Sequence, residues 1–258
     1  MTAVSTALWR LFGVLVVAFM LTPLALVVLF SFTDNALTNF PIERFSTRWF
    51  QTLFERDEFW KAFGNSLTIA GSVAVVSSVV GTLAALALAR LGERLANAVL
   101  VTLCFPVMLP ALVIGIALLV FFNKTGVPLS LATVILGHLV ITQPFVILIV
   151  YARMVGFDYA AVDSARDLGA SPWVAFWTVT FPMVSTTVIG AALIAMAISL
   201  DDFIITFFTI GGGNTLPTYI WGKVRTYLDP SINAIGTILL ALTIASTVLA
   251  LRLSRYRG

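Results

Sequence analysis

Charged residues are scarce in this sequence, and their scarcity excludes most soluble folds. Only 10% of the 258 residues are Asp, Glu, Lys or Arg, whereas 60% are hydrophobic and the mean hydropathy is +1.03. A soluble domain carries about a quarter charged residues. Because the apolar runs are long and unbroken, they indicate membrane-spanning helices rather than the short alternating strands of a membrane barrel. The net charge of +3 includes no basic patch that would suit nucleic acid.

Cysteine and histidine are almost absent as well. The single cysteine, Cys104, lies in an apolar run and has no partner for an internal disulfide. The single histidine, His138, is interpreted as a hydrogen-bonded structural residue, because no second His or Cys stands at a spacing suited to a metal. One residue of each kind gives no converging nucleophile and base, which argues against an intramembrane enzyme. The phosphate-binding pattern Gly-x-x-x-x-Gly-Lys-Ser/Thr is missing too, so the chain has no ATP site of that kind.

The apolar runs predict six membrane spans, because each span needs about 20 mostly apolar residues. The first run is too long for the core of a signal peptide and lacks a small-residue cleavage site, so we keep it as a span. Residues 1–258 are therefore expected to form one transmembrane domain with a polar loop at 153–181. The six predicted spans are 10–32, 65–89, 97–122, 130–152, 182–207 and 232–252.

The orientation of the chain follows only weakly from its basic residues. Of the 15 Lys and Arg, eight lie on the side that holds both termini and seven lie on the other. Three of the eight, Arg252, Arg255 and Arg257, form a cluster in the C-terminal tail, which favours cytoplasmic termini. On the opposite side, residues 47–63 are expected to form an amphipathic surface helix with aromatic side chains at headgroup depth.

The polar loop 153–181 carries the most informative pattern. Residues 158–168 predict a helix with small and apolar side chains on one side and Asp163, Arg166 and Asp167 on the other. Gly169 is expected to end this helix in a left-handed turn. Ser171 and Pro172 then begin a second helix, with serine as the cap and proline in the first position. Periodicity alone favours an ordinary interfacial loop helix.

The residues themselves point further, because this stretch resembles the coupling loop of importer permeases of the ATP-binding-cassette (ABC) class. In that signature, Glu-Ala-Ala is followed by a spaced glycine and then by Leu-Pro; here the counterparts are Asp163-Ser-Ala165, Gly169 and Phe181-Pro182. The resemblance implies an all-α membrane permease of the type I (MetI-like) architecture. It also implies that the coupling contact with an ATPase is made by Asp163, Ser164, Ala165, Arg166, Asp167, Leu168, Gly169, Ala170, Ser171 and Pro182.

Other segments are similar to the polyamine (spermidine/putrescine) branch of these permeases, namely Asn65–Ala70, Ser199–Phe203 and Thr215–Pro217. This likeness implies a subunit of a bacterial inner-membrane importer that is not itself an enzyme and holds no cofactor. Its partners would be a second homologous permease, two ATPase subunits that hold ATP and Mg²⁺, a periplasmic solute-binding protein and the bilayer. The branch also includes permeases for other small organic solutes, so a different cargo is the alternative.

Four polar residues are candidates for the cargo pathway. Asp201 and Asp202 lie near the outer end of the fifth predicted span, and carboxylates at membrane depth usually face a pathway or a partner. Adjacent helical residues do not share a face, so at most one of the two is expected to point into a pore. The alternative is that the span ends there and both are solvated, or that they pair with Lys223 or Arg225. Asn65 and Ser66 open the second span and either line a polar cavity or begin the helix. A stand-alone secondary transporter is a rival reading, but the mid-span positions are almost free of charge.

Overall fold

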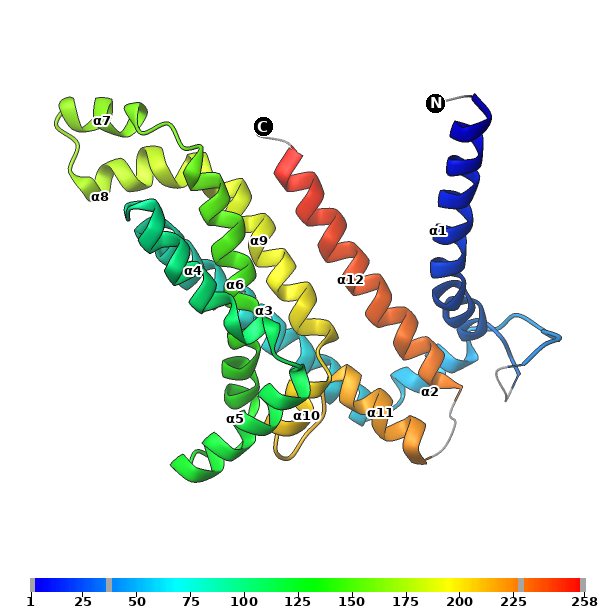
Figure 1. Cartoon of the computed structure of the whole chain (residues 1–258). Coiled ribbons are helices and arrows are strands. Elements are labelled where there is room, and N and C mark those ends of the chain that lie inside the picture. The colour runs from blue at the N-terminus through cyan, green and yellow to red at the C-terminus, as the bar shows by residue number, and fades with distance from the viewer. Residues whose placement is uncertain (1–2, 36–38, 227–229, 256–258) are drawn as a thin grey trace. The chain divides into compact units, whose positions relative to one another are not determined.

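The computed structural model describes residues 3–35, 39–226 and 230–255 (Figure 1). Within this part the regular elements are all helices, and one isolated antiparallel bridge joins Thr33 and Phe45. The chain divides into two compact units, residues 1–60 with 219–241 and residues 61–218 with 242–258. Of the basic tail, Arg257 and the side chain of Arg255 lie outside the described part.

The first unit begins with the long helix α1 (Ala3–Ser31). Its apolar part, Leu8–Ser31, is almost entirely unburied within this chain. The short helix α2 (Arg48–Phe54) follows, and α3 begins at Asp57. The single surface helix expected over 47–63 is therefore wrong. Two acidic residues, Asp57 and Glu58, occupy the first turn of α3, where the helix dipole favours negative charge and a new helix start.

The second unit is built around the helix pair α6 (Leu131–Val155) and α9 (Phe181–Asp201), which pack along each other. Their contact buries a core of aliphatic side chains that includes Val146, Val150, Val184 and Ala191, together with Ala85 of α3 (Asp57–Leu88). Burial of this kind of surface stabilises the pair by about 25 cal/mol per Å² of apolar area when water is the alternative. In lipid the gain is chiefly close packing.

Five of the described helices are long and apolar enough to cross a membrane: α1, α3, α6, the continuous stretch Pro172–Asp201, and α12 (Ser231–Arg255). The pair α4 (Glu93–Met108) and α5 (Ala111–Thr125) makes a sixth crossing if it counts as one span. This confirms an all-helical membrane fold with up to six spans. The two units are defined by contacts within the chain. They do not test whether residues 1–258 form one transmembrane domain, and that expectation stays a prediction.

The third span is not the continuous helix expected over 97–122. Between α4 and α5 the axis bends by 94°. Pro110 has no N–H with which to continue α4, and its ring pushes the preceding Leu109 out of the helical region. Leu109 is accordingly extended, with φ −85° and ψ 145°.

The fifth span also ends earlier than the predicted 182–207. Helix α9 stops at Asp201, and Asp202 is extended, with φ −70° and ψ 119°. A separate short helix, α10 (Ile204–Thr209), follows, and α11 (Leu216–Thr226) comes after a glycine-rich turn. The break arises because the Asp202 carboxylate accepts the backbone N–H of Thr206 at 3.1 Å, and Asp side chains that bond nearby backbone groups favour new helix starts over helix interiors.

Candidate functional site

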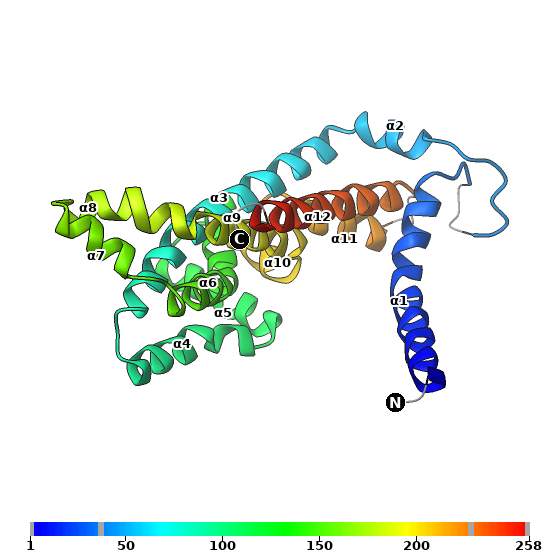
Figure 2. The ribbon, with the colours of Figure 1, turned by 90° about the horizontal axis from the view of Figure 1, so that it is seen from above.

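The exposed hairpin formed by α7 (Ala160–Asp167), residues 168–171 and α8 (Pro172–Ala175) is the first candidate site, named here the coupling surface. In both views it projects from one end of the second unit (Figures 1 and 2). Helix α7 lies within the predicted 158–168. At its end, Ala170 N–H donates to the Ala165 carbonyl at 3.0 Å and Gly169 N–H donates to the Arg166 carbonyl at 2.9 Å.

This bond pair is the Schellman motif, and it requires a left-handed residue at its turn. Gly169 supplies that residue with φ +91°, so the predicted glycine break is confirmed. The serine cap of the second helix is confirmed as well. Ser171 is extended, its Oγ accepts the Val174 N–H at 3.3 Å, and Pro172 follows in the first turn. Both turns of the coupling surface are therefore fixed by local hydrogen bonds.

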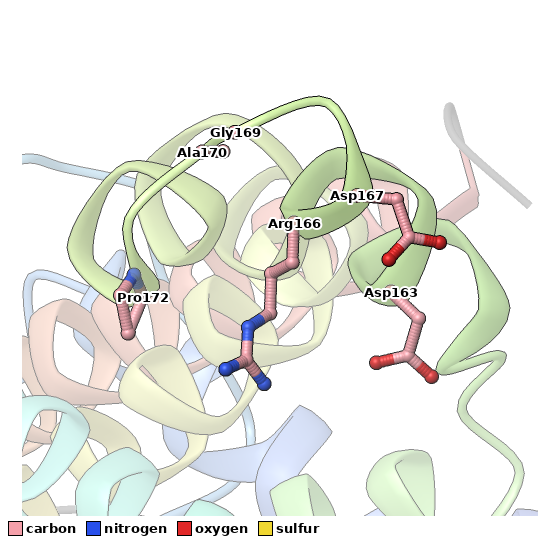
Figure 3. A pocket seen from close by; sticks show the side chains of 6 residues that line it. All are labelled: Asp163, Arg166, Asp167, Gly169, Ala170 and Pro172. Carbon is pink, nitrogen blue, oxygen red and sulfur yellow. The ribbon is translucent and has the colours of Figure 1, made fainter.

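The charges of the coupling surface border an open hollow of about 420 Å³. Figure 3 shows Asp163 and Asp167 next to each other on α7, while Arg166 extends between them and Pro172 in this view. Within the described residues, none of these three charged side chains forms an ion pair. Leu168 at the tip is 90% exposed. A surface with unpaired charges of both signs around an exposed leucine suits docking to another protein.

The coupling surface is joined to the membrane helices in two ways. Val162 of α7 packs against the core shared by α3, α6 and α9. On the other side, α8 continues through a π-helical turn, η1 (Phe176–Thr180), directly into α9. Trp173, Phe176 and Trp177 form an aromatic cluster at this turn, with ring centroids 5.0–6.2 Å apart, one pair stacked and two pairs edge-to-face. The hairpin is therefore in contact with the core and continuous with α9.

The second candidate site is a buried polar group at the α9–α10 break, named here the His138 cluster: His138, Ser199, Asp202 and Thr206. His138 lies on α6 and is 1% exposed. Its Nδ1 is 2.7 Å from Ser199 Oγ, and its Nε2 is 2.9 Å from Thr206 Oγ1 and 3.2 Å from Asp202 Oδ1. The interpretation of His138 as hydrogen-bonded structure is thus confirmed, and it holds α6, α9 and α10 together.

Helix α10 is clamped on both sides at close range. A Cβ added at Gly115 of α5 would lie 2.8 Å from Phe208, and one added at Gly137 of α6 would lie 2.7 Å from Ile205. Thr133 Oγ1 donates to the Thr209 carbonyl at 2.7 Å. These contacts allow α10 to sit against α5 and α6 at a distance that side chains larger than hydrogen at the two glycines would prevent.

The four pathway candidates are placed differently. Asp202 is 10% exposed and is held by His138 and by the Thr206 N–H. Asp201, one residue earlier, is exposed. The expectation that at most one of the two carboxylates points into a pore stays a prediction. Lys223, one of the alternative partners considered for them, pairs with Glu58 at 3.5 Å.

Asn65 and Ser66 do not begin a helix, because α3 has already run for two turns when it reaches them. Asn65 Nδ2 donates to the Asn214 carbonyl at 2.9 Å, and Ser66 Oγ accepts the Leu216 N–H at 2.9 Å. Both side chains thus fix the glycine-rich turn at the start of α11. Ser66 is buried, and Asn65 is half-buried.

Sequence reasoning missed Ser199 and Thr206 as members of the site. They stand three residues before and four residues after Asp202, so the three polar residues follow helical spacing inside an otherwise apolar stretch. Such a stripe is a signal for polar groups gathered on one face. No group of three or more His, Cys, Asp or Glu suited to a metal occurs among the described residues.

The sequence is similar to those of known membrane transport proteins. The profile of the family described as "Binding-protein-dependent transport system inner membrane component" matches residues 77–256. The putrescine transport system permease protein PotI of Escherichia coli is 32% identical over 241 residues, which cover 90% of this chain and 85% of PotI. The spermidine/putrescine transport system permease protein PotC of Haemophilus influenzae is 31% identical over 245 residues, covering 95% of each chain.

Solved structures give the same fold. A chain of a bacterial ABC transporter involved in the import of the acidic polysaccharide alginate superposes with a TM-score of 0.71 over 96% of this chain and 95% of its own, at 16% identity. A chain of the MetNI methionine ABC transporter in an inward-facing conformation gives a TM-score of 0.56 over 79% of this chain and 99% of its own, also at 16% identity. Both likenesses concern the fold alone.

Proposed function

The chain belongs to the family of binding-protein-dependent transport system inner membrane components, and we propose that it is the permease for a polyamine such as putrescine or spermidine. Membership of the family makes it a multi-pass inner-membrane transport subunit of an ABC importer. The observation that supports the cargo is the identity of 31–32% with putrescine and spermidine/putrescine permeases over at least 90% of this chain. An importer permease for a different small solute is the alternative.

The chemistry of a polyamine suits the one exposed carboxylate at the break in the fifth span. Such a cargo carries ammonium groups separated by methylene chains, and each ammonium group requires acceptors when it leaves water. Asp201 offers a carboxylate that is not held by the His138 cluster. Asp202 is already occupied by His138 and by a backbone N–H. Asp201 is therefore the residue we assign to the first contact with cargo.

The proposed energy source lies outside this chain. Separate ATPase subunits, two in number, would bind ATP and Mg²⁺ and dock against the coupling surface, where Asp163, Arg166 and Asp167 are unpaired within the described residues. Closure of the ATPase pair would then move the hairpin, and η1 would carry the motion into α9. A second homologous permease and a periplasmic binding protein complete the proposed importer, with both termini of this chain in the cytoplasm.

The proposed orientation of the chain is consistent with an energy source in separate ATPase subunits. With the termini in the cytoplasm, the coupling surface would lie in the cytoplasm as well, where ATP is available, and Asp201 would lie toward the outer end of the fifth span. Substrate exposed first on one side and then on the other is the alternating-access scheme of transporters. A stand-alone secondary transporter would need no docking hairpin of this kind.

The test is a co-purification combined with uptake. The tagged chain is expressed with its native neighbours, bound proteins are identified, and the complex is reconstituted into vesicles with labelled putrescine. We expect an ATPase and a second six-span permease to co-purify, and uptake to require both ATP and the binding protein. Recovery of the chain alone, with uptake that survives loss of the ATPase, would support a secondary transporter. An ATP-dependent complex that ignores putrescine and spermidine would reject only the cargo.

A further inference from the structure

His138 connects the two halves of the broken fifth span to α6, and the transport scheme above gives it no part. It contacts the end of α9 through Ser199 and the start of α10 through Thr206, with Asp202 at the break between them. Its own backbone carbonyl accepts from Thr142 Oγ1 at 2.9 Å, and Thr142 in turn meets Ser77 of α3 at 3.0 Å. The break is thus the end of a polar chain that crosses three helices.

The hydrogen-bond pattern assigns a direction to each contact of the imidazole. The Thr206 hydroxyl hydrogen is used on the Asp202 carbonyl oxygen at 3.1 Å, so Thr206 Oγ1 is left as an acceptor. Nε2 therefore carries a hydrogen and donates it to Thr206 Oγ1, with the Asp202 carboxylate 3.2 Å away. The hydrogen on Nε2 is placed by this network, as histidine tautomers in structures generally are.

Fixing Asp202 also fixes its neighbour. Asp201 is the last residue of α9, and its direction depends on where that helix stops. Asp202 stops the helix because its Oδ1 is shared between His138 Nε2 and the Thr206 N–H. If Asp202 were released, its extended backbone would lose the contacts that hold it, and α9 would be free to continue by a turn. The Asp201 carboxylate would then rotate with it.

We propose that His138 is a positioning residue for transport: by holding Asp202 at the α9–α10 break, it sets the direction of the Asp201 carboxylate toward the cargo pathway. Asp201 meets the cargo, Asp202 holds the break, and His138 holds Asp202. The part played by Asp201 rests on the proposed function. The link from His138 to the direction of Asp201 does not, and it can be measured without any cargo.

The first experiment is therefore free of cargo. The only native cysteine is removed by Cys104→Ala, Asp201→Cys is introduced, and the rate of alkylation by a membrane-impermeant cationic thiol reagent is measured in the intact complex. We expect His138→Asn to change this rate about tenfold, because it keeps an amide near Ser199 but withdraws the donor from Asp202. His138→Gln, whose amide nitrogen reaches about as far as Nε2, is expected to restore the rate.

Ser199→Ala is the matched control, since it removes the other bond of the same imidazole and leaves the Asp202 contact in place. Its rate is expected to match that of the parent. Equal rates in the parent, His138→Asn and His138→Gln would overturn the proposal, as would a change of equal size in Ser199→Ala. Each variant is first confirmed as monodisperse, so that a folding defect is not read as a change of direction.

The second experiment uses putrescine uptake and a double-mutant cycle. Asp201→Asn and His138→Asn are each expected to raise KM about tenfold with little change in kcat, and the double variant is expected to be no worse than Asp201→Asn alone, because both act through one carboxylate. Additive effects would overturn the positioning role. If the parent transports no polyamine, the proposed cargo fails while the alkylation result still stands.

Discussion

At the scale of single residues, the adjacent carboxylates Asp201 and Asp202 differ because a helix ends between them. Asp202 is 90% buried, accepts a hydrogen bond from the backbone N–H of Thr206, and has its Oδ1 3.2 Å from His138 Nε2. Asp201 is exposed at the last position of α9. The Asp202 side chain is therefore a buried hydrogen-bond acceptor, whereas the adjacent Asp201 side chain is an exposed charge.

This difference predicts two separate phenotypes. Asp202→Asn is expected to lower the thermal stability of the purified chain, because a charge-assisted acceptor of two buried donors is lost at a cost of about 1–3 kcal/mol. Asp201→Asn is expected to leave the unfolding midpoint unchanged and to raise KM for putrescine. Thermal unfolding in detergent and uptake in vesicles measure the two effects. The assignment is wrong if both variants shift the midpoint equally.

Gly169 supports a second prediction at this scale. Its φ of +91° costs an L-residue about 1–2 kcal/mol, and a β-branched side chain is the least tolerant of it. Gly169→Val is expected to disrupt the Schellman turn, leave the chain inserted in the membrane, and abolish ATP-dependent uptake. Gly169→Asn is expected to keep most of the uptake, because asparagine adopts this conformation more readily.

A matched control for Gly169 is Gly156, which ends α6 with a negative φ of −98° and has no atom within 4 Å of an added Cβ. Gly156→Ala is expected to transport normally. Normal uptake by Gly169→Val would show that the coupling surface does not transmit the motion of an ATPase.

At the scale of elements, α10 depends on two glycines rather than on its own length. It has only six residues, and isolated helices that short are not stable. Gly115 and Gly137 let it approach α5 and α6 closely, and Thr133 bonds its last carbonyl. The stability of the broken span is therefore supplied by neighbouring helices.

Gly137→Ala tests this account, because the new methyl would lie 2.7 Å from Ile205 Cγ2. Overpacking of this kind costs about 1–3 kcal/mol, so the unfolding midpoint of the purified chain is expected to fall. Adding Ile205→Ala, which removes the obstructing branch, is expected to recover part of the loss. Gly190→Ala on α9 is the control, since nothing lies within 4 Å of its added Cβ. An unchanged midpoint in Gly137→Ala would contradict the clamp.

The elements also differ in how well the sequence alone predicts them. Local signals were sufficient for the coupling surface, since Gly169, Ser171 and Pro172 each act through bonds to residues within five positions. Local signals did not predict the helix breaks at Leu109 and Asp202, because the apolar run continues across each break. Pro110 marks the first of these breaks, but proline alone does not predict one, because prolines are also tolerated within continuous membrane helices. At the second break, Asp202 accepts a local bond from the Thr206 N–H but also contacts His138, 64 positions away, and no periodicity within one segment reports such a contact.

At the scale of the whole molecule, the orientation in the membrane rests on the basic tail, because basic residues are otherwise shared almost equally, eight on one side and seven on the other. A direct measurement follows from the exposed tip of the coupling surface. In a Cys104→Ala background, Leu168→Cys places a thiol at a side chain that is 90% exposed. It is expected to react with an impermeant thiol reagent in inverted vesicles and to be protected in right-side-out vesicles.

Lys124→Cys, at the exposed end of α5, is the matched control for the opposite face and is expected to give the reverse pattern. An ATPase that uses cytoplasmic ATP can reach the hairpin only on the cytoplasmic side. The two labelling patterns therefore decide whether an ATPase can dock on the coupling surface as proposed. Reaction of Leu168→Cys from outside would place the coupling surface away from ATP, and both the proposed topology and the proposed energy source would fail together.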